Sequence, residues 1–247
     1  MKGLNKLPEI TILFWIIKII ATTLGETAGD LLSMTFHVGY AGSSVIFLLF
    51  FLVSLLIQLT SKRFHPIIYW TVILSTSLAG TTMSDFMDRS LGLGYATGTM
   101  ILIVILFAIL SIWKYVEKTI SVAEINASRS EIFYWSSILA SNTLGTALGD
   151  FLADDSGLGF LGGAALIGSL LIFAVFAYYR TKISHIVLFW FAFVLTRPFG
   201  ATFGDLLTKS HEKGGLNFGT IGSTITLGSL LVIFIFISTK KYRVSNR

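Results

Sequence analysis

Four aspartates stand at equivalent points of a pattern that occurs four times in the chain. The pattern reads Trp, nine residues, Gly, four residues, Asp, and its copies are Trp15-Gly25-Asp30, Trp70-Gly80-Asp85, Trp135-Gly145-Asp150 and Trp190-Gly200-Asp205. Identical spacing in every copy predicts one structural unit repeated four times. Carboxylate oxygens are the ligands that hard divalent cations prefer, so the four aspartates are candidate metal ligands.

Polar residues precede each aspartate at steps of four residues. The rows are Lys18, Thr22, Glu26 and Asp30; Ser77, Thr81 and Asp85; Asn142, Thr146 and Asp150; and Arg197, Ala201 and Asp205. Residues four apart lie on one face of an α-helix. Four such faces around one axis predict a polar path through Thr22, Ser77, Asn142, Thr81 and Thr146. The path is expected to end at a metal site formed by Glu26, Asp30, Asp85, Asp150 and Asp205.

Two basic residues, Lys18 and Arg197, belong to the same polar faces. A charged side chain at the centre of a bilayer costs about 2.5–3.5 kcal/mol, so each of them needs a partner. We expect them to pair with a carboxylate or to gate the path, and a purely structural charge clamp is an equal alternative. For each aspartate, the alternative to a metal ligand is a residue that ends its helix and lies in water.

The elements that carry these residues are predicted to be membrane-spanning helices. The chain is 54% hydrophobic and 13% charged, with a mean hydropathy of +0.80. A helix needs roughly 20 mainly apolar residues to cross the hydrocarbon. Segments of that length lie near 9–30, 41–60, 66–87, 95–114, 131–152, 160–179, 184–207 and 217–238. The repeated tryptophans are expected to anchor the helices at the membrane interface.

The expected fold is an all-α polytopic membrane protein of about eight transmembrane helices. One membrane domain, 1–247, would hold four parallel two-helix repeats at about 8–63, 64–118, 128–182 and 183–241, with a cytoplasmic linker at 114–130. Most of the 18 Lys and Arg residues fall on one side of this arrangement, and only Arg89, Lys209 and Lys213 fall on the other. By the positive-inside rule, both termini are therefore predicted to be cytoplasmic.

Several segments resemble a family of uncharacterised bacterial repeat membrane proteins, namely Pro8-Glu9, Phe14-Trp15, Gly25 to Asp30, Gly145 to Asp150 and Gly200 to Asp205. This resemblance implies the repeated membrane fold and no particular activity. A second likeness is to the GDT1-type cation/proton exchangers, whose signature pairs a Glu with an Asp. Here Glu26 and Asp30 are four apart instead of three, and Leu31 and Leu32 replace the basic and hydroxyl residues of that signature.

These features favour a transporter or channel for a small cation, preferably a divalent one such as Mn, Mg or Ca. The alternatives are a non-transporting scaffold or sensor, and a transporter of an organic cation. No nucleophile with a His partner, zinc signature or phosphate loop is present, so the protein is not expected to be an enzyme.

The expected surroundings follow from the same features. The location is a bacterial inner or plasma membrane, and the partners are the lipid bilayer and the cation. The net charge of +5 is explained by the basic loops, so no nucleic acid is expected. Apart from a bound divalent cation no cofactor is assigned, and oligomerisation is left open.

Overall fold

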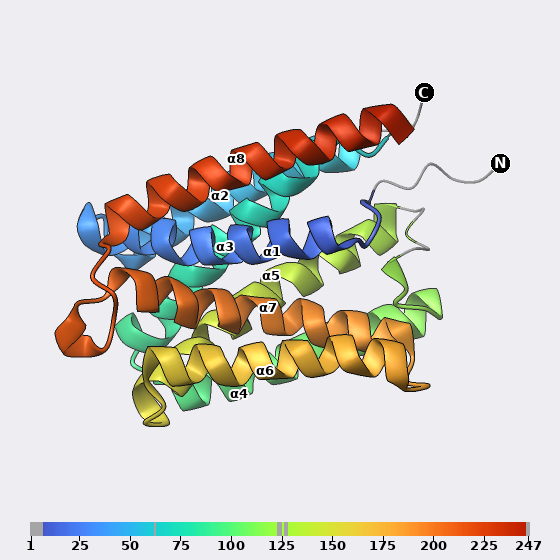
Figure 1. The fold of residues 1–247 in the computed structure, drawn as a ribbon. Coiled ribbons are helices and arrows are strands. Elements are labelled where there is room, and N and C mark those ends of the chain that lie inside the picture. The colour runs from blue at the N-terminus through green and yellow to red at the C-terminus, as the bar shows by residue number, and fades with distance from the viewer. Residues whose placement is uncertain (1–6, 62, 123–124, 126–127, 246–247) are drawn as a thin grey trace.

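The computed structural model describes residues 7–61, 63–122, 125 and 128–245. This part of the chain contains eight long helices and no strand (Figure 1), which confirms the predicted all-helical class. The helices are α1 (Ile12–Asp30), α2 (Tyr40–Thr60), α3 (Pro66–Asp85), α4 (Tyr95–Glu117), α5 (Ser128–Asp150), α6 (Gly159–Arg180), α7 (His185–Thr208) and α8 (Thr220–Ser245). Of the predicted linker 114–130, residues 123–124 and 126–127 lie outside the described residues, and both ends belong to α4 and α5.

The odd-numbered helices form the centre of the molecule. Helix α1 packs against α3 and α7, and α5 packs against the same two helices, so the four make a closed bundle. Each even helix covers the odd helix of the following repeat: α2 lies on α3, α4 on α5 and α6 on α7. Helix α8 returns to cover α1, as Figure 1 shows, so the last repeat closes on the first.

The outer helices carry the surface that suits a bilayer. Apolar side chains such as Val45, Val104 and Val232 are exposed on α2, α4 and α8. Among the described residues, six helices are long and apolar enough to cross a membrane, within Ile12–Thr35, Tyr40–Thr60, Tyr95–Glu117, Gly159–Arg180, His185–Thr208 and Thr220–Tyr242. Helices α3 and α5 are less apolar because their buried faces are rich in hydroxyl side chains. The chain is a multi-pass membrane protein.

The repeated glycines set the distance between neighbouring central helices. A Cβ atom added at Gly25 would lie 2.4 Å from Ser77 Cβ, and one at Gly80 would lie 2.8 Å from the backbone carbon of Asn142. The other two contacts follow the same cyclic order, Gly145 against Arg197 and Gly200 against Thr22. Small residues let membrane helices approach closely. Each repeat glycine therefore faces a polar position of the next repeat.

The tryptophans of the pattern do not serve as interfacial anchors, and that prediction is wrong for most of them. Trp70, Trp135 and Trp190 are only 1%, 0% and 5% exposed, and Trp15 is partly buried. They pack against Phe14, Tyr69, Tyr134 and other aromatic rings of adjacent helices. Because the odd helices are central, their large side chains meet one another and not the lipid.

The helices do not stop at the repeated aspartates. After Asp30, Asp85 and Asp150 the chain continues as one π-helical turn, in η1 (Leu31–Thr35), η2 (Phe86–Ser90) and η4 (Phe151–Asp155). Helix α7 instead runs on as an α-helix to Thr208. Such π-turns are rare, and they occur often at functional sites.

Candidate cation site

All five predicted carboxylates are buried between the central helices. Glu26, Asp30, Asp85, Asp150 and Asp205 are between 2% and 4% exposed. The alternative in which each aspartate ends its helix in water is therefore wrong, since the helices continue and the side chains face the bundle. Buried carboxylates need a charge partner or a bound ion.

Two side-chain cations divide the four aspartates into pairs. Arg89, in η2, lies 3.0 Å from Asp85 Oδ1 through Nε and 3.1 Å from Asp150 Oδ2 through Nη2. Lys209 follows the end of α7, and its Nζ lies 2.9 Å from both Asp30 Oδ2 and Asp205 Oδ1. Each cation joins the aspartate of its own repeat to that of the next repeat. The end of the bundle at which the four aspartates lie is thus built as two clamps, one around Arg89 and one around Lys209.

From the sequence, Arg89 and Lys209 were assigned only to the side of the membrane opposite the termini, with no role in the site. A signal was present, because each follows its own aspartate by four residues, which is the spacing of an ion pair on one helix face. Met34 and Asp154 stand at the corresponding places after Asp30 and Asp150. For Lys209, burial works against the charged form, but the carboxylates of Asp205 and Asp30 raise its pKa above the usual value. The ammonium therefore stays charged at neutral pH.

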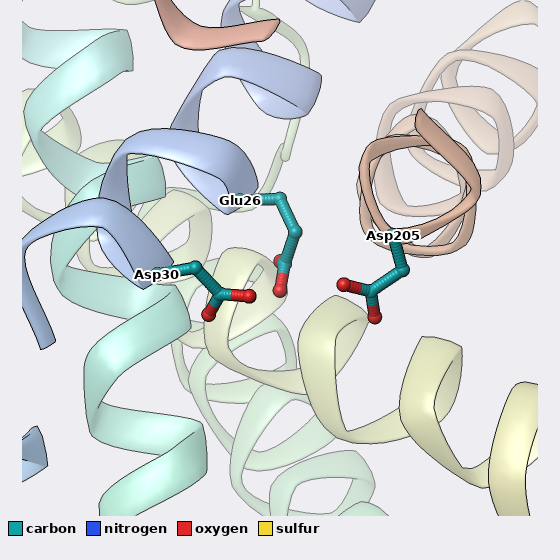
Figure 2. A group of neighbouring side chains, drawn as sticks. All are labelled: Glu26, Asp30 and Asp205. Atoms are coloured by element: carbon teal, nitrogen blue, oxygen red, sulfur yellow. The ribbon is translucent and has the colours of Figure 1, made fainter. Parts of the chain in front are cut away.

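Three of the carboxylates come together in a group that can hold a metal ion. Glu26 and Asp30 project from α1 toward Asp205 of α7 (Figure 2), and one oxygen of each lies within 4.8 Å of the others. We call Glu26, Asp30 and Asp205 the acidic cluster. Asp85 and Asp150 lie outside it, around Arg89. The five predicted ligands thus form a cluster of three and a separate pair.

Arg197 contacts one member of the acidic cluster, Glu26, and is fully buried. Its Nη2 is 2.9 Å from Glu26 Oε2 and also donates to the hydroxyls of Thr81 and Thr146. Its Nε and Nη1 have no hydrogen-bond partner among the described residues. Arg197, one of the two predicted gate residues, is therefore paired with Glu26, which only the first repeat possesses.

Lys18 lies further along the same axis and has a different environment. Its Nζ is 3.5 Å from Asn142 Oδ1 and 4.1 Å from the centre of the Phe193 ring. The Asn142 amide in turn donates to the hydroxyls of Thr76 and Ser77. The two predicted basic residues therefore differ, because Arg197 has a carboxylate partner and Lys18 is bound by an amide and a ring.

The residues of the predicted polar path are all buried in the centre of the bundle. Thr22, Ser77, Asn142, Thr81 and Thr146 come from three different helices, and each is 0% exposed. Thr22 donates to the backbone oxygen of Thr196, and Thr81 donates to that of Gly25, so hydroxyls also tie adjacent helices together. No surface of these five side chains is exposed in this structure.

A sequence comparison agrees with this repeated architecture. The profile of a family described as Repeat of Unknown Function (DUF347) matches residues 13–64, 68–119, 133–184 and 188–243. Each match covers most of one central helix and its following outer helix, so the four predicted repeats are confirmed. No curated protein and no solved structure matches the chain.

Proposed function

We propose that this chain, which belongs to the family described as Repeat of Unknown Function (DUF347), moves a small cation across a membrane. The observation that carries the proposal is the acidic cluster, in which three buried carboxylates converge within 4.8 Å. Oxygen ligands of this kind suit hard divalent cations. A divalent ion such as Mn²⁺, Mg²⁺ or Ca²⁺ is the favoured substrate.

The balance of charge supports the same proposal. The five predicted ligands are paired with three side-chain cations, Arg89, Lys209 and Arg197, so within this group two negative charges remain when all of its members are ionised. Uncompensated charge in a water-poor interior is strongly unfavourable. One divalent cation would neutralise the difference.

Lys209 determines how such an ion would bind. Its ammonium lies between Asp30 and Asp205, where two of the three ligands of the acidic cluster point. A cation that uses both carboxylates must displace the ammonium, so we infer that the tethered lysine and the substrate exchange at this site. The buried Arg197, bound to Glu26, would then separate the acidic cluster from the part of the polar path near Lys18.

The proposal includes an orientation in the membrane. All eight long helices would span the bilayer, with both termini in the cytoplasm, because the basic residues concentrate on that side. The acidic cluster would then lie near the non-cytoplasmic surface of a bacterial inner or plasma membrane. The likeness to GDT1-type exchangers rests on Glu26 and Asp30 and stays a prediction, as does the absence of enzyme activity.

The first test is the thermal stability of the purified protein in detergent with Mg²⁺, Ca²⁺, Mn²⁺, Zn²⁺, Na⁺ and K⁺. A ligand at a hundred times its dissociation constant stabilises by about 2.7 kcal/mol, which is a measurable shift. The variant Asp30→Asn removes a ligand of the acidic cluster, and Asp150→Asn removes an equivalent aspartate outside it. We expect a shift with one ion in the wild type and in Asp150→Asn, and none in Asp30→Asn.

The alternative of a scaffold or sensor makes the opposite prediction. If no ion shifts the melting temperature of the wild type, the paired carboxylates hold the helices together and serve no substrate. If Asp30→Asn and Asp150→Asn abolish the ion-dependent shift in melting temperature equally, the acidic cluster, Asp85 and Asp150 act together as one site.

The organic-cation alternative has one observation in its favour. A cavity of about 790 Å³ lies between α1, α6 and α7, lined in part by Trp15, Phe189, Tyr178 and Tyr179. Aromatic faces attract organic cations. The cavity also reaches Thr196, whose backbone oxygen accepts a bond from Thr22 of the polar path. Stabilisation by tetramethylammonium, lost in Trp15→Leu and retained in Asp30→Asn, would support this alternative.

A further inference from the structure

Lys18 is a buried basic residue for which the described part of the chain offers no carboxylate within ion-pair distance. Its side chain is 0% exposed, and its contacts are the Asn142 amide oxygen at 3.5 Å and the Phe193 ring at 4.1 Å. In the other three repeats the corresponding positions hold apolar residues, Ile73, Ile138 and Phe193. Packing at this level therefore requires no charge, and the lysine is an exception that needs a reason.

The charged and titratable groups around Lys18 do not supply a counter-charge. On its own helix, Glu26 lies two turns away and is already paired with Arg197 of α7, whose positive charge repels an ammonium at Lys18. Helices α3 and α5 present Tyr69 and Tyr134, whose hydroxyls bond to each other at 2.7 Å. Helix α8, which covers α1, has no charged residue between Thr220 and Thr239.

We propose that Lys18 is a proton-binding site on the axis of the bundle, with an uncharged amine in the closed conformation. The Asn142 amide oxygen and the Phe193 ring offset only part of the cost of an ammonium that is buried without a counter-charge, so the neutral amine is favoured. When the bundle opens to water, the lone pair of the nitrogen accepts a proton and no other bond changes. On closing, the proton must leave again.

The link to transport rests on the function proposed above. Lys18 lies on the same polar face as Thr22 and Glu26, eight residues from the acidic cluster, so the rise along α1 is about 12 Å. At an effective dielectric constant of about 20, a unit charge at that distance changes the protonation midpoint by about one pH unit. A cation bound to the acidic cluster would therefore expel the proton from Lys18, which would couple the two ions.

The protonation of Lys18 can be followed directly by NMR. The full-length protein is labelled with ¹³Cε-lysine in lipid nanodiscs, and Lys18→Met assigns the resonance. The apolar residues at the equivalent positions indicate that Lys18→Met will fold, and Lys18→Gln provides a second assignment variant. We expect one resonance, absent from both variants, to titrate more than about two pH units below the remaining lysines. If it titrates together with them, the proposal is wrong.

A second arm separates this inference from the proposed function. The titration is repeated with Mg²⁺ or Ca²⁺, whichever raises the melting temperature of the wild type, and ion binding is measured on Lys18→Met as well. A midpoint that falls by about one pH unit or more on ion binding would support the coupling. If Lys18 titrates at low pH and the ion binds without changing that midpoint, the coupling is wrong and the proton-binding site stands. If Lys18 titrates at low pH and no ion binds, only the proposed cation function is wrong.

Discussion

Arg197 Nη2 lies 2.9 Å from Glu26 Oε2, and this ion pair joins the last repeat to the first in the middle of the bundle. Breaking a buried pair leaves one charge uncompensated and typically costs about 3–5 kcal/mol. We therefore expect Arg197→Met and Glu26→Gln each to destabilise the protein by that amount. Reversible unfolding in mixed micelles with increasing SDS measures the change.

The double variant Arg197→Met with Glu26→Gln tests whether the two effects have one origin. Because it leaves neither charge unpaired, its destabilisation should be smaller than the sum of the single effects by about 1–3 kcal/mol. Strict additivity would show that Arg197 and Glu26 stabilise the bundle through separate contacts.

Gly80 faces the backbone of α5, where an added Cβ would lie 2.8 Å from the carbonyl carbon of Asn142 and 2.9 Å from the nitrogen of Thr143. Overpacking of this kind costs about 1–3 kcal/mol, so Gly80→Ala should destabilise the protein by that amount. Gly222 of α8 is the matched control, because no atom lies within 4 Å of the position its Cβ would take. Gly222→Ala should be neutral or stabilising by up to about 1 kcal/mol. Equal effects in the same unfolding assay would contradict the close approach of α3 and α5.

The sequence predicted the repeats and the helices because both depend on local patterns. Spacing alone identified the four aspartates, and hydropathy identified the long apolar segments. The lateral order of the helices has no such local signal. That α2 covers α3, and that α8 covers α1, depends on packing between repeats, which a pattern within one repeat does not encode.

The same limit explains why the ion pairs between repeats could not be predicted from the sequence. The sequence predicted a carboxylate partner for Lys18 and Arg197 without identifying it, and the structure pairs Arg197 with Glu26, 171 residues away. The clamp residues Arg89 and Lys209 were assigned only to the side of the membrane opposite the termini, although their spacing from Asp85 and Asp205 indicated pairing. Their bonds to the next repeat, at Asp150 and Asp30, require knowledge of which helices are neighbours.

The proposed orientation can be tested with single cysteines, since the chain contains none. Ser156 follows η4 at the end where the carboxylates lie, and Lys182 follows α6 at the opposite end, and both are exposed. In intact spheroplasts, we expect a membrane-impermeant maleimide to label Ser156→Cys at once and Lys182→Cys only after permeabilisation. The reverse result would place the acidic cluster on the cytoplasmic side and contradict the proposed orientation.

Substitutions of Lys209 and Arg89 distinguish the role of the acidic cluster from that of the clamp around Arg89. Lys209 Nζ contacts two members of the acidic cluster, whereas Arg89 contacts Asp85 and Asp150 outside it. A substrate cation no longer has to displace an ammonium in Lys209→Met. Hydrogen bonds to charged groups contribute about 1.5–3 kcal/mol, so we expect this variant to bind the ion at least about tenfold more tightly.

Arg89→Met removes the same charge from the other clamp and serves as the control for that prediction. The loss of either cation should lower the stability of the ion-free protein, because two carboxylates lose their partner. Only Lys209→Met should also gain ion affinity, measured by isothermal titration of the purified protein. If both variants gain affinity equally, the ion responds to the total charge at the end of the bundle where the four aspartates lie, and the acidic cluster has no special role. If Lys209→Met loses affinity, the lysine does not compete with the ion, and the proposed exchange at Asp30 and Asp205 is wrong.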